Sequence, residues 1–287
     1  MDNELYSYSP IIKRPKLEFP NGARVAFWIG LNLEHFEVGK PSTSIHGLTA
    51  AFAPDPLNHG WRDYGPRVGL WRIMEILEKH GMRASVLLNA DVCKYYPDII
   101  EEGNKRNWVW LAHGKNNSTL QVGMDLETER AYLTDVVNTI KSATGKQPKG
   151  WLGPALTETF NTPDLLEDLG LSYICDWCAD DQPFKLNTRK GGMISVPYSI
   201  EVNDIPLFLG QGMSGPEFCQ LVTDQFDVLY EEGRKTGRVM CLALHPFLVG
   251  LPFRSKYLDK ALAHIKGHKD VWLATSDEIA DWYLKRK

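Results

Sequence analysis

Short apolar runs alternate with helical patterns along almost the whole chain. Eight apolar runs predict strands over residues 24–33, 83–89, 107–113, 149–153, 171–177, 192–199, 238–245 and 270–274. Between them, apolar residues recur with helical spacing and predict helices over 65–80, 94–106, 125–143, 161–169, 214–233, 255–267 and 275–285. Several strand runs are continuously apolar and β-branched, which is typical of strands that are covered on both faces.

This alternation of strands and helices predicts a parallel α/β fold. No glycine-rich phosphate loop follows the first strand, which argues against a nucleotide-binding doubly wound sheet. We therefore expect a distorted (β/α) barrel of seven or eight parallel strands. Residues 1–22 are polar and interrupted by prolines, so they are expected to form an N-terminal arm over a single barrel domain that spans residues 23–287.

The composition narrows the range of partners. The formal net charge is −4 and no basic stripe is present, so we expect neither a nucleic acid nor a membrane as partner. No run of 18 apolar residues and no signal-peptide core occurs, which favours a cytoplasmic location. Five scattered cysteines do not suggest a disulfide framework. Aromatic residues around Trp61, Trp71 and Phe253 are compatible with a homo-oligomer.

Candidate catalytic residues follow the predicted strands, at the end where (β/α) barrels carry their chemistry. The first strand leads to Asn32 and Glu34, the third ends at His113 with Asn117 beyond it, and the seventh ends at His245. Each histidine alone could be a structural residue, but a buried carboxylate is costly unless it is paired or used. An acid and two imidazoles at one barrel mouth predict acid/base hydrolysis of a polar small-molecule substrate, with or without a metal.

Other polar residues near the predicted strand ends are candidates for holding the substrate. The segment WRDYGPRVGLWR, residues 61–72, places arginine and aspartate where they would bind a carbonyl or carboxylate group. The full set expected to bind substrate is Asn32, Arg62, Asp63, Asn117, Pro154, Asp176 and Arg254.

Five segments occur in an order that is specific for one family. They are Asn32-Leu33-Glu34, LAHGKNNS (111–118), KGWLGPALTETFNTP (149–163), YICDWCADDQPF (173–184) and LALHPF (242–247). From about residue 22 to the C-terminus, this order resembles the NodB-homology polysaccharide deacetylases. The stretches RDYGPRVGLWR, DDQPF, VPYSIEVNDIP, FDVLYEEG and HPFLVGLPFR resemble a subgroup of that family, the metal-independent allantoinases and related amidohydrolases.

The resemblance implies a role for each matching position. In deacetylases of this family an aspartate acts as base, a second carboxylate and a His-x-x-x-His pair bind a divalent metal, usually zinc, and a late histidine is the general acid. At these positions the chain has Asn32 for the base, Glu34 for the acidic ligand, His113 and Asn117 for the pair, and His245 for the acid. The family's Arg-x-Pro motif has also lost its arginine, because Leu152 stands in its place.

These replacements leave two mechanisms open. In one, Glu34, His113 and Asn117 bind zinc or another divalent metal, although the amide oxygen of Asn117 is a weak ligand for zinc. In the other, which we prefer, no cofactor is needed: Glu34 activates water, while His113 and backbone donors stabilise the oxyanion.

The function expected from the sequence is hydrolysis of a carbon–nitrogen bond in a small amide, ureide or N-acyl compound, as in the allantoinases. Glu34, His113 and His245 would be its catalytic residues. One alternative is zinc-dependent N-deacetylation of acetylated amino sugars. Another is a non-catalytic ligand-binding barrel, which would explain the lost base, the lost second histidine and the lost motif arginine.

Overall fold

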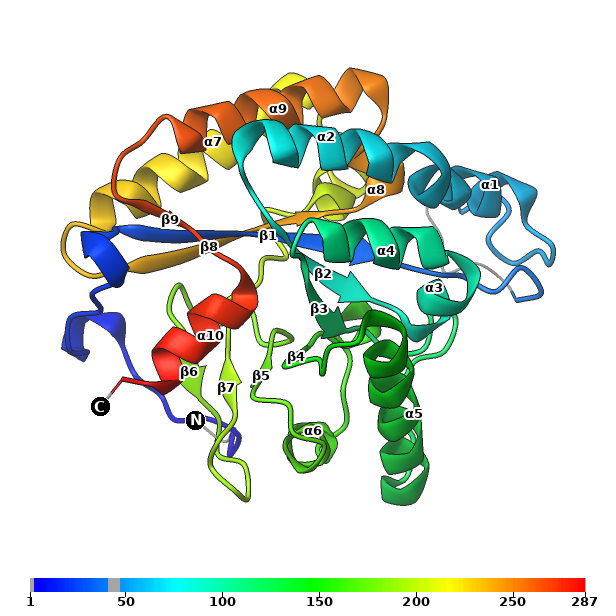
Figure 1. Cartoon of the computed structure of the whole chain (residues 1–287), viewed down its shortest axis with the longest axis horizontal. Helices are drawn as coiled ribbons and strands as arrows, with labels where there is room; N and C mark the ends of the chain where they lie inside the picture. Colours follow the sequence, from blue (N-terminus) through cyan, green and yellow to red (C-terminus); the bar gives the residue numbers. More distant parts are fainter. Residues whose placement is uncertain (1–2, 41–46, 287) are drawn as a thin grey trace.

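A curled, mostly parallel sheet is the framework of the computed structural model, which describes residues 3–40 and 47–286 (Figure 1). The strand order is β6-β7-β5-β4-β3-β2-β1-β8, and β9 pairs with the start of β1. The strands are β1 (Val25–Leu33), β2 (Ala84–Leu88), β3 (Val109–Ala112), β4 (Gly150–Trp151), β5 (Tyr173–Ile174), β6 (Phe184–Lys185), β7 (Ile194–Ser195), β8 (Arg238–Leu244) and β9 (Val271–Leu273). The predicted distorted (β/α) barrel is confirmed, with one addition: β6 runs antiparallel to β7.

Strand β1 lies at the centre of this sheet. Residues 29–33 pair with β2, residues 25–27 pair with β9 on the same edge, and residues 25–31 pair with β8 on the other edge. All nine residues of β1 are buried, because helices cover one face and the barrel interior covers the other. This double coverage explains why the segment is continuously apolar in the sequence.

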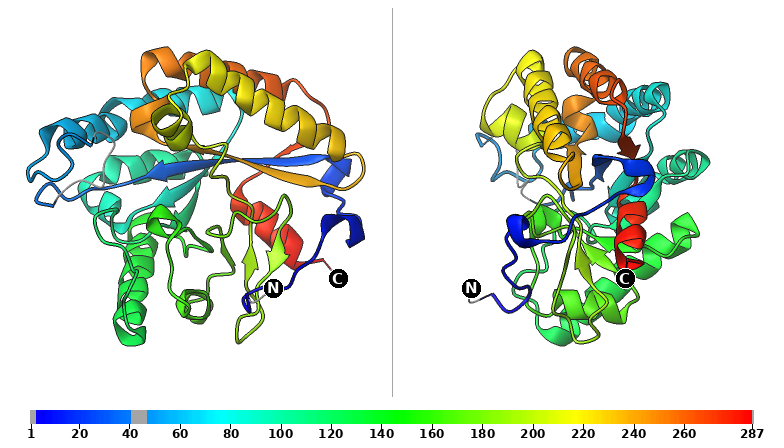
Figure 2. Two further views of the ribbon diagram at one scale, coloured as in Figure 1. Left: turned by 180° about the vertical axis from the view of Figure 1, so that it is seen from behind. Right: turned by 90° about the vertical axis from the view of Figure 1, so that its left-hand side faces the viewer.

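Helices cover the outside of the curled sheet. They are α1 (Pro56–Tyr64), α2 (Leu70–His80), α3 (Ala90–Tyr95), α4 (Pro97–Lys105), α5 (Leu126–Thr144), α6 (Thr162–Asp168), α7 (Gly215–Glu232), α8 (Pro246–Val249), α9 (Pro252–Lys266) and α10 (Ser276–Leu284). Helices α2, α7 and α9 lie together over β1 and β8 (Figures 1 and 2). No helix in the described ranges is both long and apolar enough to cross a membrane.

The barrel interior is filled by aromatic side chains around one glycine. Trp28 and Tyr198 are both buried there, and the Trp28 indole N–H donates to the Pro197 carbonyl oxygen at 3.0 Å. A Cβ atom on Gly30 would lie 3.1 Å from both the Cys241 Sγ and the Tyr198 ring. Glycine at this position therefore lets the Tyr198 ring and the Cys241 thiol pack closely against β1.

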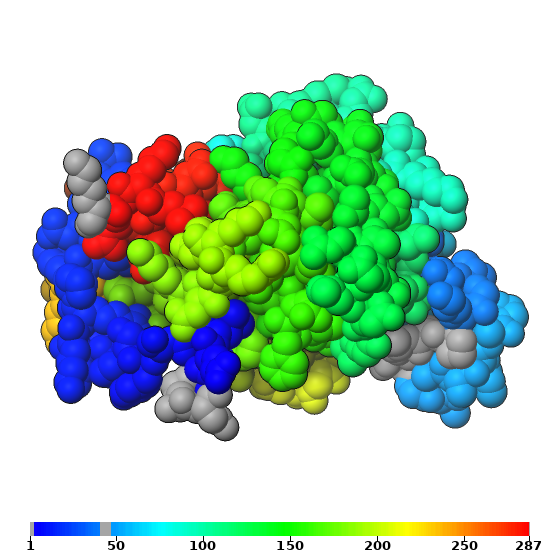
Figure 3. Space-filling view, turned by 90° about the horizontal axis from the view of Figure 1, so that it is seen from below, coloured from blue at the N-terminus to red at the C-terminus, as the bar shows by residue number. Residues whose placement is uncertain are grey.

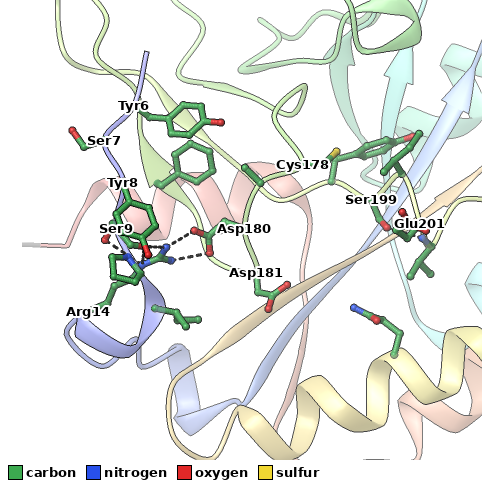
Figure 4. Close-up of a pocket in the computed structure, with 18 residues that line it drawn as sticks. Tyr6, Ser7, Tyr8, Ser9, Arg14, Cys178, Asp180, Asp181, Ser199 and Glu201 are labelled. Atoms are coloured by element: carbon green, nitrogen blue, oxygen red, sulfur yellow. Dashed lines mark hydrogen bonds and ion pairs between the residues drawn. The ribbon is translucent and has the colours of Figure 1, made fainter. Parts of the chain in front are cut away.

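The sheet does not close on itself between its two edge strands, β8 and β6. Two backbone hydrogen bonds cross the opening, from Val239 N–H to the Asp181 oxygen at 2.7 Å and from Ala243 N–H to the Val202 oxygen at 3.1 Å. Beside this opening, a pocket of about 690 Å³ lies between the N-terminal arm and residues 178–184. An ion pair holds the arm against residues 178–184: the Arg14 guanidinium contacts the Asp180 carboxylate at 2.6 Å (Figure 4).

The N-terminal arm also packs against the C-terminal helix. Phe19 is buried, and its ring centroid lies 4.9 Å from that of Trp282 in α10. Figure 3 shows the arm in blue beside α10 in red. All five cysteines are free thiols, as their scatter in the sequence suggests.

A close backbone contact joins the turn before α2 to α8, directly after His245. A Cβ atom on Gly69 would lie 2.1 Å from the Pro246 carbonyl oxygen, and rigid backbone cannot move aside. We expect Gly69→Ala to lower the free energy of unfolding by about 1–3 kcal/mol or more. Gly60→Ala is the control: open space surrounds that Cβ position within α1, so it should stabilise by about 0.5–1 kcal/mol. Urea unfolding of the two variants measures the difference, and equal stabilities would contradict the contact.

Candidate active site

A cavity of about 530 Å³ opens at the carboxyl ends of the strands. Six of the residues singled out in the sequence line it together: Asn32, Glu34, Arg62, His113, Asn117 and His245. Apolar side chains such as Phe36, Leu209 and Phe247 form much of the remaining wall. A largely apolar cavity of this size with a few converging polar groups is typical of a small-molecule site.

Glu34 is the centre of the polar cluster, directly after β1. Its Oε1 accepts a hydrogen bond from the Asn117 amide nitrogen at 2.6 Å and lies 3.5 Å from His113 Nε2 and 3.7 Å from His245 Nε2. The side chain is only 10% exposed. Burial by itself raises the pKa of Glu34, but the imidazoles of His245 and His113 outweigh it and hold the pKa below its usual range. Glu34 is therefore an ionised acceptor throughout the physiological pH range.

His245, at the end of β8, is held by a buried carboxylate. Asp204 is fully buried; one of its oxygens accepts the His245 backbone N–H at 2.8 Å and the other lies 2.7 Å from His245 Nδ1. Burial works against a charged imidazole, but Asp204 and Glu34 outweigh it and raise the pKa of His245 to about 10. At neutral pH the ring is a cation, so Nε2 carries a proton that points toward Glu34.

His113 follows β3, and a hydrogen bond at Nδ1, the ring nitrogen that does not face Glu34, fixes the orientation of its ring. Nδ1 lies 2.6 Å from the Leu152 carbonyl oxygen. A carbonyl oxygen only accepts, so Nδ1 carries a proton. Nε2 is buried without a hydrogen-bond partner and faces Glu34. In the neutral ring Nε2 is thus an acceptor, and in the protonated ring it is a donor aimed at the cavity.

A chain of amides fixes which atom of Asn117 faces the cavity. The Asn89 side-chain oxygen accepts the His35 backbone N–H at 2.8 Å, so the Asn89 amide nitrogen must face the other way. That nitrogen donates to Asn117 Oδ1 at 3.1 Å. The Asn117 amide nitrogen is left to donate to Glu34. Turning the Asn117 amide over would place two oxygens together and two N–H₂ groups together, so the donor orientation is fixed.

Two further polar residues complete the cavity wall. Asn32 donates to the Tyr198 hydroxyl at 3.1 Å and to the Leu244 carbonyl oxygen at 3.2 Å, so its amide is held by β8 and the barrel interior. The Arg62 guanidinium lies 3.4 Å from the centroid of the Phe36 ring. Burial lowers the pKa of Arg62 to about 10 although Glu34 acts in the opposite direction, so Arg62 is a cation at neutral pH.

A strained turn forms the cavity wall beside His113. Ala155 and Leu156 line the cavity, and both have positive φ angles, 56° and 55°, which are costly for residues other than glycine. Asp176 holds this turn from behind, because its carboxyl oxygen accepts the Gly153 backbone N–H at 2.6 Å. Burial raises the pKa of Asp176 well above its ordinary value, and it raises that of neighbouring Glu158 to about 7. Asp176 thus acts as a positioning residue behind the wall.

Four residues predicted to bind substrate do not line the cavity: Asp63, Pro154, Asp176 and Arg254. Asp63 is exposed on α1, and Pro154 is the buried first residue of the strained turn. The Arg254 guanidinium, on α9, lies 4.2 Å from the centroid of the Phe208 ring. These four follow strands or share a segment with Arg62, but their side chains point elsewhere.

Two residues that support the cluster also follow predicted strands, although neither is among the residues expected to act on the substrate. Asp204 lies in the segment VPYSIEVNDIP, 41 positions before His245, and nothing in that spacing indicates that the two meet. Asn89 directly follows β2, so the strand-end rule that points to Glu34 and His113 points to it as well.

The fold and the cluster together define a class of protein: an open (β/α) barrel with an acid and two imidazoles at the carboxyl ends of its strands, arranged for acid/base hydrolysis. The family model for polysaccharide deacetylases matches residues 62–174. A Schizosaccharomyces pombe protein named "Putative polysaccharide deacetylase" is 30% identical over 244 residues, which cover 78% of this chain and 75% of that protein. The chain therefore belongs to the polysaccharide deacetylase family.

Solved structures agree with this assignment. A "probable Polysaccharide deacetylase" from Pseudomonas aeruginosa PAO1 has a TM-score of 0.83 at 28% identity and covers 95% of each chain. The PuuE allantoinase has a TM-score of 0.84 at 27% identity, and the match covers 96% of this chain and 95% of the allantoinase chain. The chain is accordingly a hydrolase of the class that acts on carbon–nitrogen bonds other than peptide bonds.

Proposed function

We propose that this protein hydrolyses a carbon–nitrogen bond of a small amide, ureide or N-acyl compound, in the manner of an allantoinase, and that it needs no metal to do so. The observation that carries the proposal is the charge arrangement around Glu34: an ionised carboxylate beside a histidine that Asp204 keeps protonated. The likeness to the PuuE allantoinase supports the choice of a small substrate.

In the proposed reaction, Glu34 removes a proton from water as the water oxygen attacks the substrate's carbonyl carbon. Negative charge then develops on the carbonyl oxygen. The Arg62 guanidinium, which faces the same cavity, is the group that would stabilise it. His245 gives its Nε2 proton to the departing nitrogen, and the carbon–nitrogen bond breaks. The proton held by Glu34 returns to His245 and restores the starting state.

The residues in the cavity do not make a good ligand set for zinc. Asn117 presents its amide nitrogen, which cannot bind a cation, and His245 is protonated. Among the cavity residues that the structure describes, only Glu34 and the Nε2 atom of His113 remain as strong donors for zinc. Catalytic zinc sites supply three protein ligands, so this pair falls short. Zinc bound on Glu34, His113 and Asn117 would first require the amide chain through Asn89 to be rearranged.

Metal removal is the direct test of this mechanism. We expect the protein to hydrolyse a ureide or amide at an unchanged rate after treatment with a chelator, because Glu34 and His245 supply the base and the acid. The assay compares turnover of a panel of ureides, amides and N-acyl compounds before and after chelation. Activity on acetylated amino-sugar oligomers that chelation abolishes and zinc restores would favour the zinc-dependent deacetylase instead. Saturable binding without turnover under both conditions would favour a non-catalytic barrel.

A further inference from the structure

Three side chains of types that can bind a metal meet on helices that cover the outside of the barrel. Asp227 lies on α7, His264 lies in the last turn of α9, and His268 follows that helix. One ligand atom from each residue lies within 4.8 Å of the other two. We propose that these residues form a zinc site that joins α7 to α9.

The ring of His268 is already oriented for metal binding. His268 Nδ1 lies 2.9 Å from the His264 backbone oxygen, so Nδ1 carries a proton and Nε2 is the nitrogen that binds a metal in the neutral ring. Metal-bound histidines are commonly oriented in this way, with the second ring nitrogen donating to a carbonyl or carboxylate. The ring of His268 also packs edge-on against Phe226 and Tyr230, at centroid distances of 5.0 Å each.

The third donor is in place on the neighbouring helix. His264 Nε2 lies 2.7 Å from Asp227 Oδ1, and the centroids of the two histidine rings are 4.7 Å apart. A zinc ion bonded to His264 Nε2 would replace this hydrogen bond, and the ring proton would move to Nδ1. Small side-chain rotations suffice for this change, because Asp227 is exposed and both histidines are partly exposed.

The donor types select the metal. Two imidazoles and one carboxylate suit zinc and similar transition metals, whereas magnesium and calcium require oxygen ligands. Water would complete the tetrahedral coordination, because the group lies at the surface.

The place of the group in the fold indicates a stabilising role. Helix α7 leads into the start of β8, and α9 leads into the start of β9, so the group lies toward the amino-terminal ends of the strands. In (β/α) barrels this end contributes stability, and the opposite end carries catalysis. An ion shared by α7 and α9 would tie together two helices that pack against each other beside β8.

Isothermal titration of chelator-treated protein with zinc tests the proposal. We expect one zinc ion per chain and no binding of magnesium. His268→Gln and Asp227→Asn should each weaken zinc binding by more than about tenfold. Zinc at one hundred times its dissociation constant should raise the melting temperature of the wild type by about 5–10 °C and leave that of His268→Gln unchanged.

Two control variants locate the ion. His80→Gln removes a histidine whose Nε2 also lies 2.7 Å from an aspartate oxygen, that of Asp259, but this pair is not part of a three-donor group among the described residues. Glu34→Gln alters the cavity. Both variants should bind zinc as the wild type does. Zinc binding that survives in His268→Gln, or that is lost in Glu34→Gln, would overturn the proposal, as would a wild type that binds no zinc.

Discussion

Glu34→Gln is expected to reduce turnover by about 10²–10⁴-fold, the usual contribution of a general base, while the protein stays folded. Glutamine has nearly the same shape and keeps an oxygen that can accept the Asn117 amide hydrogen bond. It cannot take a proton from water, so only the chemical step is lost. Steady-state kinetics on the best substrate of the panel, together with a thermal melt, separates loss of chemistry from loss of fold.

The matched control is Glu37→Gln, three residues further along the same segment. Glu37 accepts an Asn116 amide hydrogen bond at 3.0 Å and does not line the cavity. Its replacement should therefore leave turnover unchanged. A Glu34→Gln variant that keeps turnover within about tenfold of the wild type would contradict the assignment of Glu34 as base.

Periodicity alone could predict most of the fold. The continuously apolar segments correspond to β1, β2 and β8. Both faces of these strands are buried, so their sequences contain an unbroken apolar run that is easy to recognise. The predicted helix over 94–106 is two helices, α3 and α4, because Pro97 lacks the backbone N–H that a helix interior requires. Strand β6 has only two residues, too few to show a period, so its antiparallel pairing was not foreseen.

The site was predictable only in part, for a geometric reason. The ends of β1, β3 and β8 must meet at one rim of the barrel, so Glu34, His113 and His245 could be placed together from the sequence. Side-chain direction could not be read in the same way: Arg62 and Asp63 are adjacent, yet only Arg62 lines the cavity. Asp204 lies at the start of a helical turn beyond β7, and no pattern in the sequence pairs it with His245.

Asp204→Asn is the second substitution with a large expected effect, and it tests the assignment of His245 as the general acid. The side-chain oxygen of the introduced asparagine would accept the His245 backbone N–H, so its amide nitrogen would face His245 Nδ1 as a donor. The ring then has to present Nδ1 as an acceptor, which only its neutral form can do. In the wild type the Asp204 carboxylate raises the pKa of His245 against the effect of burial. Without that carboxylate, burial would lower the pKa of His245. We expect turnover at neutral pH to fall by about 10²–10⁴-fold.

The pH–rate profile shows whether that loss has the proposed cause. In the wild type the acid is the protonated form of His245, so activity should persist through neutral pH and decline as the pH rises through about 10. In Asp204→Asn this alkaline decline should move several units toward acid, because the cation is no longer stabilised by the buried carboxylate. Asp259→Asn, which alters the contact with His80 outside the cavity, is the control and should keep the wild-type profile. An unshifted decline in Asp204→Asn would mean that His245 is not the group that protonates the departing nitrogen.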